Sequence, residues 1–185
     1  MKYIIAVLSL LLMTSCVAAI EISEVMYNPE GTDTNREWVE VYTHAETNTE
    51  NISFFDNEGN HHLTLIQGTY NLQNYAIITN NAASFIQEHN YSGILFQASF
   101  SLSNTGESLG LKQNSEVLDN VTYSNNDGAN GNGMSLERTA SGWQESTTIG
   151  GTPGYSQAQE VPEFTGIAAA FALLGVLVFF FKKRA

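Results

Sequence analysis

Three glutamates near the N-terminal end of the chain carry the chemistry that a glycoside hydrolase uses. Two facing carboxyl groups can act as the general acid and as the base or nucleophile that cleave a glycosidic bond. Glu37 and Glu40 are three residues apart in a segment that alternates as a strand. Their side chains therefore point to opposite faces and cannot pair with each other. Glu24 could lie across from one of them. The alternative, which we favour, is that all three bond loop backbone and pair with Arg36 or Arg138.

The loop of residues 27–36 gathers oxygen-bearing side chains that suit Ca²⁺. They are Asn28, Glu30, Asp33, Thr34 and Asn35. The spacing is not that of an EF-hand, and turn formation explains the same residues without a metal. We therefore predict no metal site, and keep a calcium-assisted site as the alternative.

Other catalytic signatures are missing from the sequence. His61 and His62 are adjacent, so in a strand they face opposite ways and chelate poorly. The only cysteine is Cys16, which makes a zinc site improbable. The chain contains no GxSxG, P-loop or GxGxxG motif. The sequence predicts no catalytic residue, no cofactor and no enzyme activity.

The N-terminus has the composition of a secretory signal peptide over residues 1–19. Lys2 precedes an apolar run over residues 3–13, and small residues follow up to Ala19. Cleavage there would leave a mature chain that begins at Ile20 and has no cysteine for a disulfide. Residues 13–16, Met-Thr-Ser-Cys, also resemble a lipoprotein box that would lipidate Cys16; we favour the alternative, in which Cys16 is discarded with the signal.

A second apolar segment lies at the C-terminus. Residues 164–181 contain no charge and reach roughly 27 Å as a helix, enough for one transmembrane span. The tail of residues 182–185 is basic, and basic flanks remain cytoplasmic. We therefore predict a single-pass protein of the cell membrane, with a polar stalk over residues 155–163 and an extracytoplasmic domain over residues 20–154.

The extracytoplasmic part is strongly acidic. All 19 acidic residues of the chain lie between Glu21 and Glu163, where the basic residues are Arg36, Lys112 and Arg138. Such a surface repels phosphate backbones, so nucleic acid is excluded as a partner.

The periodicity of residues 20–154 is that of strands. Short β-branched and aromatic runs alternate with Asn, Gly, Asp and Ser clusters. The expected strands are residues 20–23, 37–42, 52–55, 62–66, 75–79, 94–100, 109–111 and 117–123. Residues 82–89 are the one helical candidate. Trp38 sits in a strongly alternating strand and is expected to be buried, and Trp143 is also expected to pack. The pattern predicts an all-β sandwich or barrel.

Several spaced motifs resemble a lamin tail domain of prokaryotic type. They are ISEVMYNPEGTDTNREWVEVY at residues 22–42, LSNTGESLGLK at 102–112, SLER at 135–138, Trp143 and GTPG at 151–154. The resemblance implies an immunoglobulin-like β-sandwich over nearly all of residues 20–154. The chain has no heptad pattern, so filament formation does not carry over.

The C-terminus also resembles a sorting signal of PEF or PEP type. Val161-Pro162-Glu163-Phe164 is followed by the apolar span and the basic end. The alternative is an ordinary tail anchor. The Pro-Glu-Phe form of the motif favours an archaeal source.

Three glycosylation sequons begin at Asn51, Asn90 and Asn120. About three are expected by chance from the composition, so they remain available sites only.

Together these features predict a non-catalytic structural or interaction module of the cell surface. Its partners would be the membrane, through one C-terminal span, and an unknown surface protein or glycan. The alternative is a calcium-assisted carbohydrate-binding domain.

Overall fold

The computed structural model describes residues 20–155. The predicted signal peptide, Cys16, the sorting motif, the span of residues 164–181 and the basic tail lie outside the described residues, as does the stalk beyond residue 155. Within the described part, no helix is long and apolar enough to cross a membrane.

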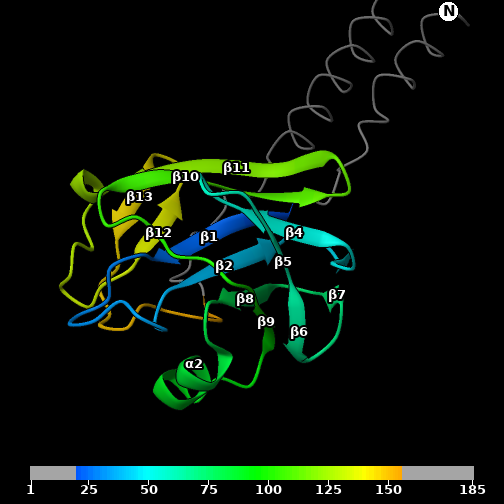
Figure 1. The fold of residues 1–185 in the computed structure, drawn as a ribbon, viewed down its shortest axis with the longest axis horizontal. Coiled ribbons are helices and arrows are strands. Elements are labelled where there is room, and N and C mark those ends of the chain that lie inside the picture. The colour runs from blue at the N-terminus through cyan, green and yellow to red at the C-terminus, as the bar shows by residue number, and fades with distance from the viewer. Residues whose placement is uncertain (1–19, 156–185) are drawn as a thin grey trace, which may run out of the picture. The chain divides into compact units, whose positions relative to one another are not determined.

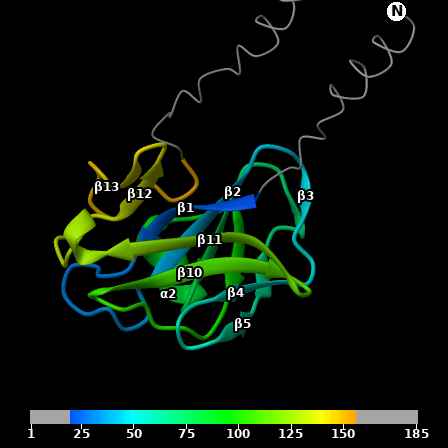
Figure 2. The ribbon, with the colours of Figure 1, turned by 90° about the horizontal axis from the view of Figure 1, so that it is seen from above.

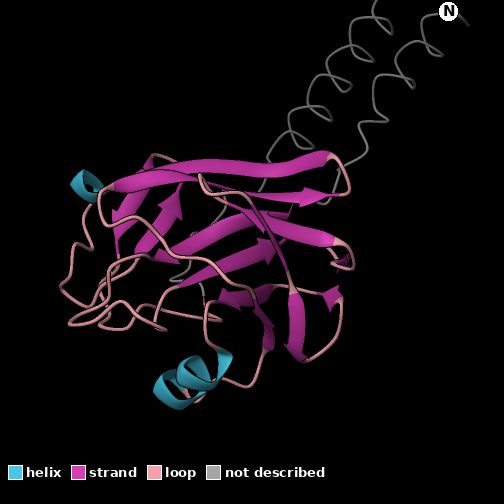
Figure 3. Cartoon of the chain, viewed as in Figure 1, coloured by secondary structure: helices cyan, strands magenta, loops and turns pink. Residues whose placement is uncertain are grey.

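Strands dominate the described chain, and helices are few (Figure 3). In chain order the first elements are β1 (Ile20–Met26), β2 (Trp38–Thr43), β3 (Thr47–Asn48), β4 (Ile52–Phe55), β5 (Asn60–His62), β6 (Thr64–Gln67), β7 (Asn71–Leu72) and β8 (Tyr75–Thr79). They are followed by α2 (Ala82–His89), β9 (Ile94–Gln97), β10 (Gly106–Gln113), β11 (Glu116–Ser124), the 3₁₀ turn η1 (Asn125–Asp127), β12 (Leu136–Thr139) and β13 (Gly142–Glu145). The all-β prediction is confirmed, and so is the helix over residues 82–89.

The strands form a seven-stranded sheet, a four-stranded sheet and a small ribbon. The larger sheet has the order β13-β12-β1-β2-β8-β9-β6, the smaller has β11-β10-β4-β5, and β3 pairs with β7. Only β8 and β9 pair in parallel among these strands, and α2 makes the crossover between them that parallel pairing requires. Figure 1 shows β10 and β11 above β1 and β2, with α2 below, and Figure 2 shows from above that β10 and β11 overlie the larger sheet.

The main core lies between the two larger sheets. Alternate apolar side chains of β1, β2, β8 and β9 meet those of β4, β10 and β11, and nearly all are removed from water. Tyr27 and Tyr123 pack across this core with ring centroids 4.8 Å apart. This face-to-face burial is the main stabilising contact of the fold, because burial of apolar area is its dominant favourable term.

A second apolar cluster covers the opposite face of the seven-stranded sheet. Met26, Trp38, Ile77 and Leu95 pack against Phe85 of α2 and its neighbours. The helix begins where the Asn81 side chain accepts a hydrogen bond from the Ser84 amide. Trp38 is 1% exposed, so its predicted burial is confirmed, but it lies under the helix and not between the sheets.

Six of the eight expected strands differ from the observed ones in their bounds, and two of these differences mark places where the chain leaves a sheet. Residues 62–66, expected as one strand, are divided at buried Leu63, because β5 belongs to the four-stranded sheet and β6 to the seven-stranded one. The strand expected over residues 94–100 ends at Gln97. The apolar pattern continues through both places, so periodicity alone did not reveal where the chain changes sheet.

Trp38→Ala is expected to lower the free energy of unfolding by about 3–5 kcal/mol, because it removes a fully buried ring. The matched control is Trp143→Ala. That ring is only partly buried and its Nε1–H donates to the Thr122 carbonyl, so the loss should be clearly smaller. Urea titration of the full-length chain in a mild detergent measures both. Equal losses for the two variants would contradict the second cluster.

Candidate functional site: carboxylates beneath the GTPG turn

Three glutamates form a row across adjacent strands of the larger sheet. In the strand register Glu24 of β1 lies directly opposite Glu137 of β12 on one side and Glu40 of β2 on the other. The expectation that Glu24 lies across from another of the glutamates is confirmed. Like charges directly opposite each other destabilise a sheet, so this row requires specific surroundings.

An irregularity in β1 allows the row to form. The β1–β2 register shifts between Ile22 and Glu24, so Ile22 faces the main core while Glu24 lies on the opposite face. Ser23, at the shift, donates its hydroxyl hydrogen to Glu40 Oε1 at 2.7 Å. Bulges of this kind redirect a side chain, and here the result is a glutamate beside a glutamate.

The row is covered by the GTPG turn, residues 151–154. The Thr152 amide donates to Glu24 Oε1 at 2.8 Å, and the Thr152 hydroxyl donates to Glu24 Oε2 at 3.0 Å. The Gly154 amide donates to Glu40 Oε2 at 2.6 Å. Both glutamates are 2% exposed. The chain's own backbone therefore occupies the place where a substrate would have to approach.

Further donors complete the coordination of both carboxyl groups. The Ser135 hydroxyl donates to Glu24 Oε1, and the Thr152 hydroxyl also lies 3.3 Å from Glu137 Oε1. With the Ser23 bond to Glu40, each oxygen of Glu24 and of Glu40 accepts at least one hydrogen bond. Buried polar groups are tolerated only when they are paired in this way.

Gly151 fixes how closely the turn approaches the glutamates. Its φ is +75°, and a Cβ at this position would lie 2.5 Å from Glu24 Oε1 and 2.8 Å from the Trp38 ring. A side chain here would meet the carboxylate and an aromatic ring that cannot both move away. Only glycine allows this contact.

Burial makes both carboxyl groups weaker acids than an ordinary glutamate. Loss of hydration raises the pKa of Glu24 to about 7, although the bonds from Ser135 and Thr152 oppose the shift. Loss of hydration, with the neighbouring charge of Glu24, raises the pKa of Glu40 to about 8. Because the two groups interact, they titrate as a pair and retain a proton near neutral pH.

Glu37 lies in a separate environment, as its spacing from Glu40 predicted. Its Oε1 accepts from the Leu102 amide at 3.0 Å, and its Oε2 accepts from Asn80 Nδ2 at 2.8 Å. Burial raises its pKa to about 7. This residue ties β2 to the chain that precedes β10.

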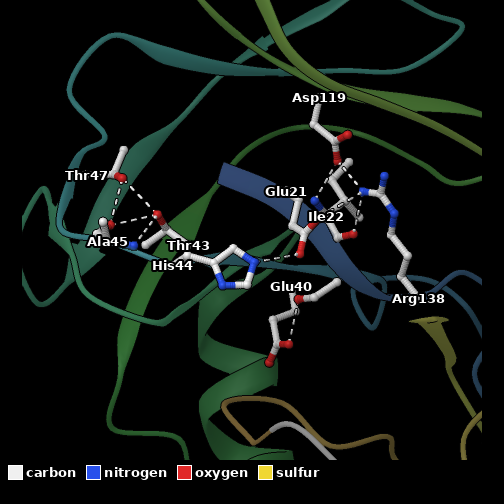
Figure 4. Close-up of polar contacts among 10 residues, drawn as sticks. Glu21, Ile22, Glu40, Thr43, His44, Ala45, Thr47, Asp119 and Arg138 are labelled. Atoms are coloured by element: carbon white, nitrogen blue, oxygen red, sulfur yellow. Dashed lines mark hydrogen bonds and ion pairs between the residues drawn. The ribbon is translucent and has the colours of Figure 1, made fainter. Parts of the chain in front are cut away.

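The prediction that the three glutamates bond loop backbone is confirmed, but the predicted arginine partners are wrong. Arg36 Nε contacts Glu88 of α2 at 2.6 Å. Arg138 contacts Asp119 at 2.7 Å and also donates to the Ile22 carbonyl (Figure 4). Arg138 follows Glu137 in β12, so it points to the other face of the sheet, toward β11.

The loop of residues 27–36 is bonded to the neighbouring loops. Asn28 donates to Asn130 Oδ1 at 2.8 Å, and Asp33 Oδ2 accepts from Asn104 at 2.6 Å. Within residues 20–155, no three His, Cys, Asp or Glu side chains are grouped so that they could hold a metal ion.

The adjacent histidines face opposite ways, as predicted. His61 Nε2 lies 2.9 Å from the buried Asp56 Oδ2, whereas His62 is exposed.

The three sequon asparagines, Asn51, Asn90 and Asn120, are exposed, so each side chain is sterically accessible.

The residues that contact Glu24 and Glu40 in this site were not identified from the sequence. Ser135, Glu137, Thr152 and Gly154 come from the SLER and GTPG motifs, which supported the family resemblance but suggested no role. They lie more than 100 positions from their glutamate partners. A single sequence contains no signal for pairing across that distance.

Comparison of the chain with models of protein families, with curated proteins and with solved structures gives no match. Function is therefore inferred from the geometry of the chain's own residues. That geometry can hold a proton out of water and can fasten the GTPG turn to the sheet.

The raised pKa values predict an unusual dependence of stability on pH. At these two groups the native state binds protons that the unfolded chain releases, so their contribution to stability is fully present below the ordinary glutamate pKa of 4.5 and is lost as the pH rises toward about 8. Glu40→Gln should make this fall shallower, by a few kcal/mol at most, because one pKa unit corresponds to about 1.4 kcal/mol. Urea titrations across the pH range measure the difference.

A glutamine can keep both contacts of Glu40, accepting from the Gly154 amide and donating to the Ser23 hydroxyl. The lowered pKa of His89, caused by its burial, acts in the opposite direction below its ordinary pKa of 6.5. Only the difference between wild type and Glu40→Gln therefore reports on the glutamate. Parallel curves for the two proteins would refute the assignment.

Proposed function

We propose that this chain is a membrane-anchored, extracytoplasmic structural or interaction module of the cell surface, and that it is not an enzyme. One observation carries the proposal. Glu24 and Glu40, the facing glutamates that were candidates for acid–base catalysis, are each 2% exposed and accept hydrogen bonds from donors of the chain itself. Their chemistry serves the fold.

A glycosidase requires the opposite arrangement. Its carboxyl groups must come within hydrogen-bond reach of the bond that is cleaved, directly or through one water. Here the GTPG turn bonds and covers both glutamates, and Gly151 approaches Glu24 so closely that no further atom fits between them. The arrangement favours a structural role for the pair.

The positions of the motifs support the lamin-tail resemblance. Glu24 and Glu40 belong to the first motif, Ser135 and Glu137 to SLER, and Thr152 to GTPG; in the fold all five meet at one site. A shared contact gives a physical reason for these segments to occur together in one chain. We therefore propose that residues 20–154 form an immunoglobulin-like sandwich of the lamin-tail type.

Attachment to a membrane is proposed from the sequence beyond the described residues. The domain is followed in the sequence by the polar stalk of residues 155–163, the uncharged segment of residues 164–181 and the basic end. In this arrangement the acidic domain faces outward, with the C-terminus in the cytoplasm. If the anchored domain binds a surface protein or glycan, the binding would use its exposed loops and the edges of its sheets.

The non-catalytic proposal is tested with glycan substrates. The purified full-length chain is expected to release no sugar from envelope polysaccharides, and Glu24→Gln and Glu40→Gln should bind isolated envelopes as wild type does. Reducing-end assays and co-sedimentation measure the two properties. Sugar release that either substitution abolishes would make the pair catalytic and overturn the proposal.

The topology is tested on intact cells. Protease added outside should remove the domain, while an epitope placed after Ala185 should be spared until the membrane is permeabilised. Replacing Lys182, Lys183 and Arg184 by Ser is the matched control, because it removes the charges on which the orientation depends. A domain that is protected in intact cells would refute the extracytoplasmic location.

A further inference from the structure

The GTPG turn is attached to the sheet through glutamates. Among the described residues, every hydrogen bond between residues 151–154 and the larger sheet ends on Glu24, Glu40 or Glu137. The turn's other backbone bonds, from Gly151 to Thr148 and from Tyr155 to Thr152, are local. The strength of its attachment therefore depends on the state of these carboxyl groups.

Ionising both of two neighbouring carboxyl groups is unfavourable in free energy while they are shielded from water. Each ion loses hydration on burial, and two like charges on facing strand positions repel each other. With one proton between them, the pair keeps its bonds to Thr152 and Gly154 and carries less charge. When that proton leaves, the repulsion and the missing hydration are relieved only if water enters, and the turn stands in the way.

The surroundings offer no compensating positive charge. Glu137 faces the pair from β12, and Tyr91, whose pKa is raised by burial and by the Glu40 charge, faces it from the chain after α2. Glu21, on β1, contacts His44 at 3.8 Å and Arg138 at 4.0 Å. His89, at the end of α2, lies against the Trp38 ring and close to Gly150. Within residues 20–155, no basic side chain makes an ion pair with Glu24 or Glu40.

We propose that Glu24 and Glu40 form a proton-dependent latch that holds the GTPG turn on the sheet while the pair retains a proton and releases the turn as the pair ionises. The open state hydrates the row of three carboxylates and uncovers the edge of the Trp38 ring beneath Gly151. It also detaches residues 151–154, so the polypeptide that follows the domain begins four residues earlier. The latch is independent of the proposed function, because it concerns only contacts within residues 20–155.

Amide hydrogen exchange in the full-length chain tests the latch directly. Thr152 and Gly154 carry the two amides that bond the glutamates. After correction for the intrinsic rate, their protection should fall by about tenfold per pH unit for each proton released on opening. The fall should extend from about pH 5 to about pH 8 and then level off, since above that range the closed state is ionised as well. Millisecond quench-flow labelling covers this range.

Glu24→Gln combined with Glu40→Gln should remove most of the dependence of this protection on pH, because neither amide side chain titrates and Glu137 is then the carboxyl group that still contacts the turn. Glu107→Gln is the matched control: Glu107 is also buried, but it accepts hydrogen bonds from the Ser103 amide and the Tyr123 hydroxyl and not from the turn. This control should keep the slope of the wild type. If the double variant does not fold, the wild-type series still decides the question.

Two results would overturn the latch. The first is protection at Thr152 and Gly154 that does not change with pH. The second is exchange of these amides at the same opening free energy and urea sensitivity as amides of β2, which would mean that the turn opens only when the whole domain unfolds. Expected instead is a urea-insensitive opening that precedes global unfolding at each pH.

Discussion

Burial of two facing carboxyl groups is the constraint around which one side of this domain is built. Pairing of β1 with β2 and β12 places three glutamates in a row, and a turn 128 positions from Glu24 and 114 from Glu40 keeps water from them. Because each buried oxygen needs a donor, the site draws on two serines, one threonine and two backbone amides. The shifted register at Ser23 and the absence of a side chain at Gly151 follow from the same requirement.

The seven-stranded sheet is covered on both faces, which explains why β2 is buried at five of its six positions. One face meets the four-stranded sheet, and the other meets α2 and the GTPG turn. Cys16 is the only cysteine of the chain, so no disulfide can form within residues 20–155. The two apolar clusters must therefore supply most of the stability, and the buried glutamates add specificity for one position of the turn.

The same pair of residue types would have a different meaning in an open cleft. A glycosidase requires two carboxyl groups with different pKa values, and loss of hydration is one way to raise the pKa of its general acid. Here too, loss of hydration on burial raises the pKa of each carboxyl group. Access distinguishes the two cases. In this domain the ligand of the carboxyl groups is the chain itself, so the available chemistry is the uptake and release of a proton. That is compatible with a surface module whose linker attachment responds to pH, as we propose.

The sequence alone determined the all-β class, the helix over residues 82–89, the opposite directions of Glu37 and Glu40, and the burial of Trp38, because these depend on local periodicity. The tertiary structure decided what those residues contact. The alternation of β2 did not reveal that its second face is covered by α2. The charges of Arg36 and Arg138 suggested ion pairs with the three glutamates, but these side chains contact Glu88 and Asp119 instead. Ser135, Thr152 and Gly154 carried no sign of their role, because a hydrogen bond across more than a hundred residues is fixed only when the sheet register brings its two ends together.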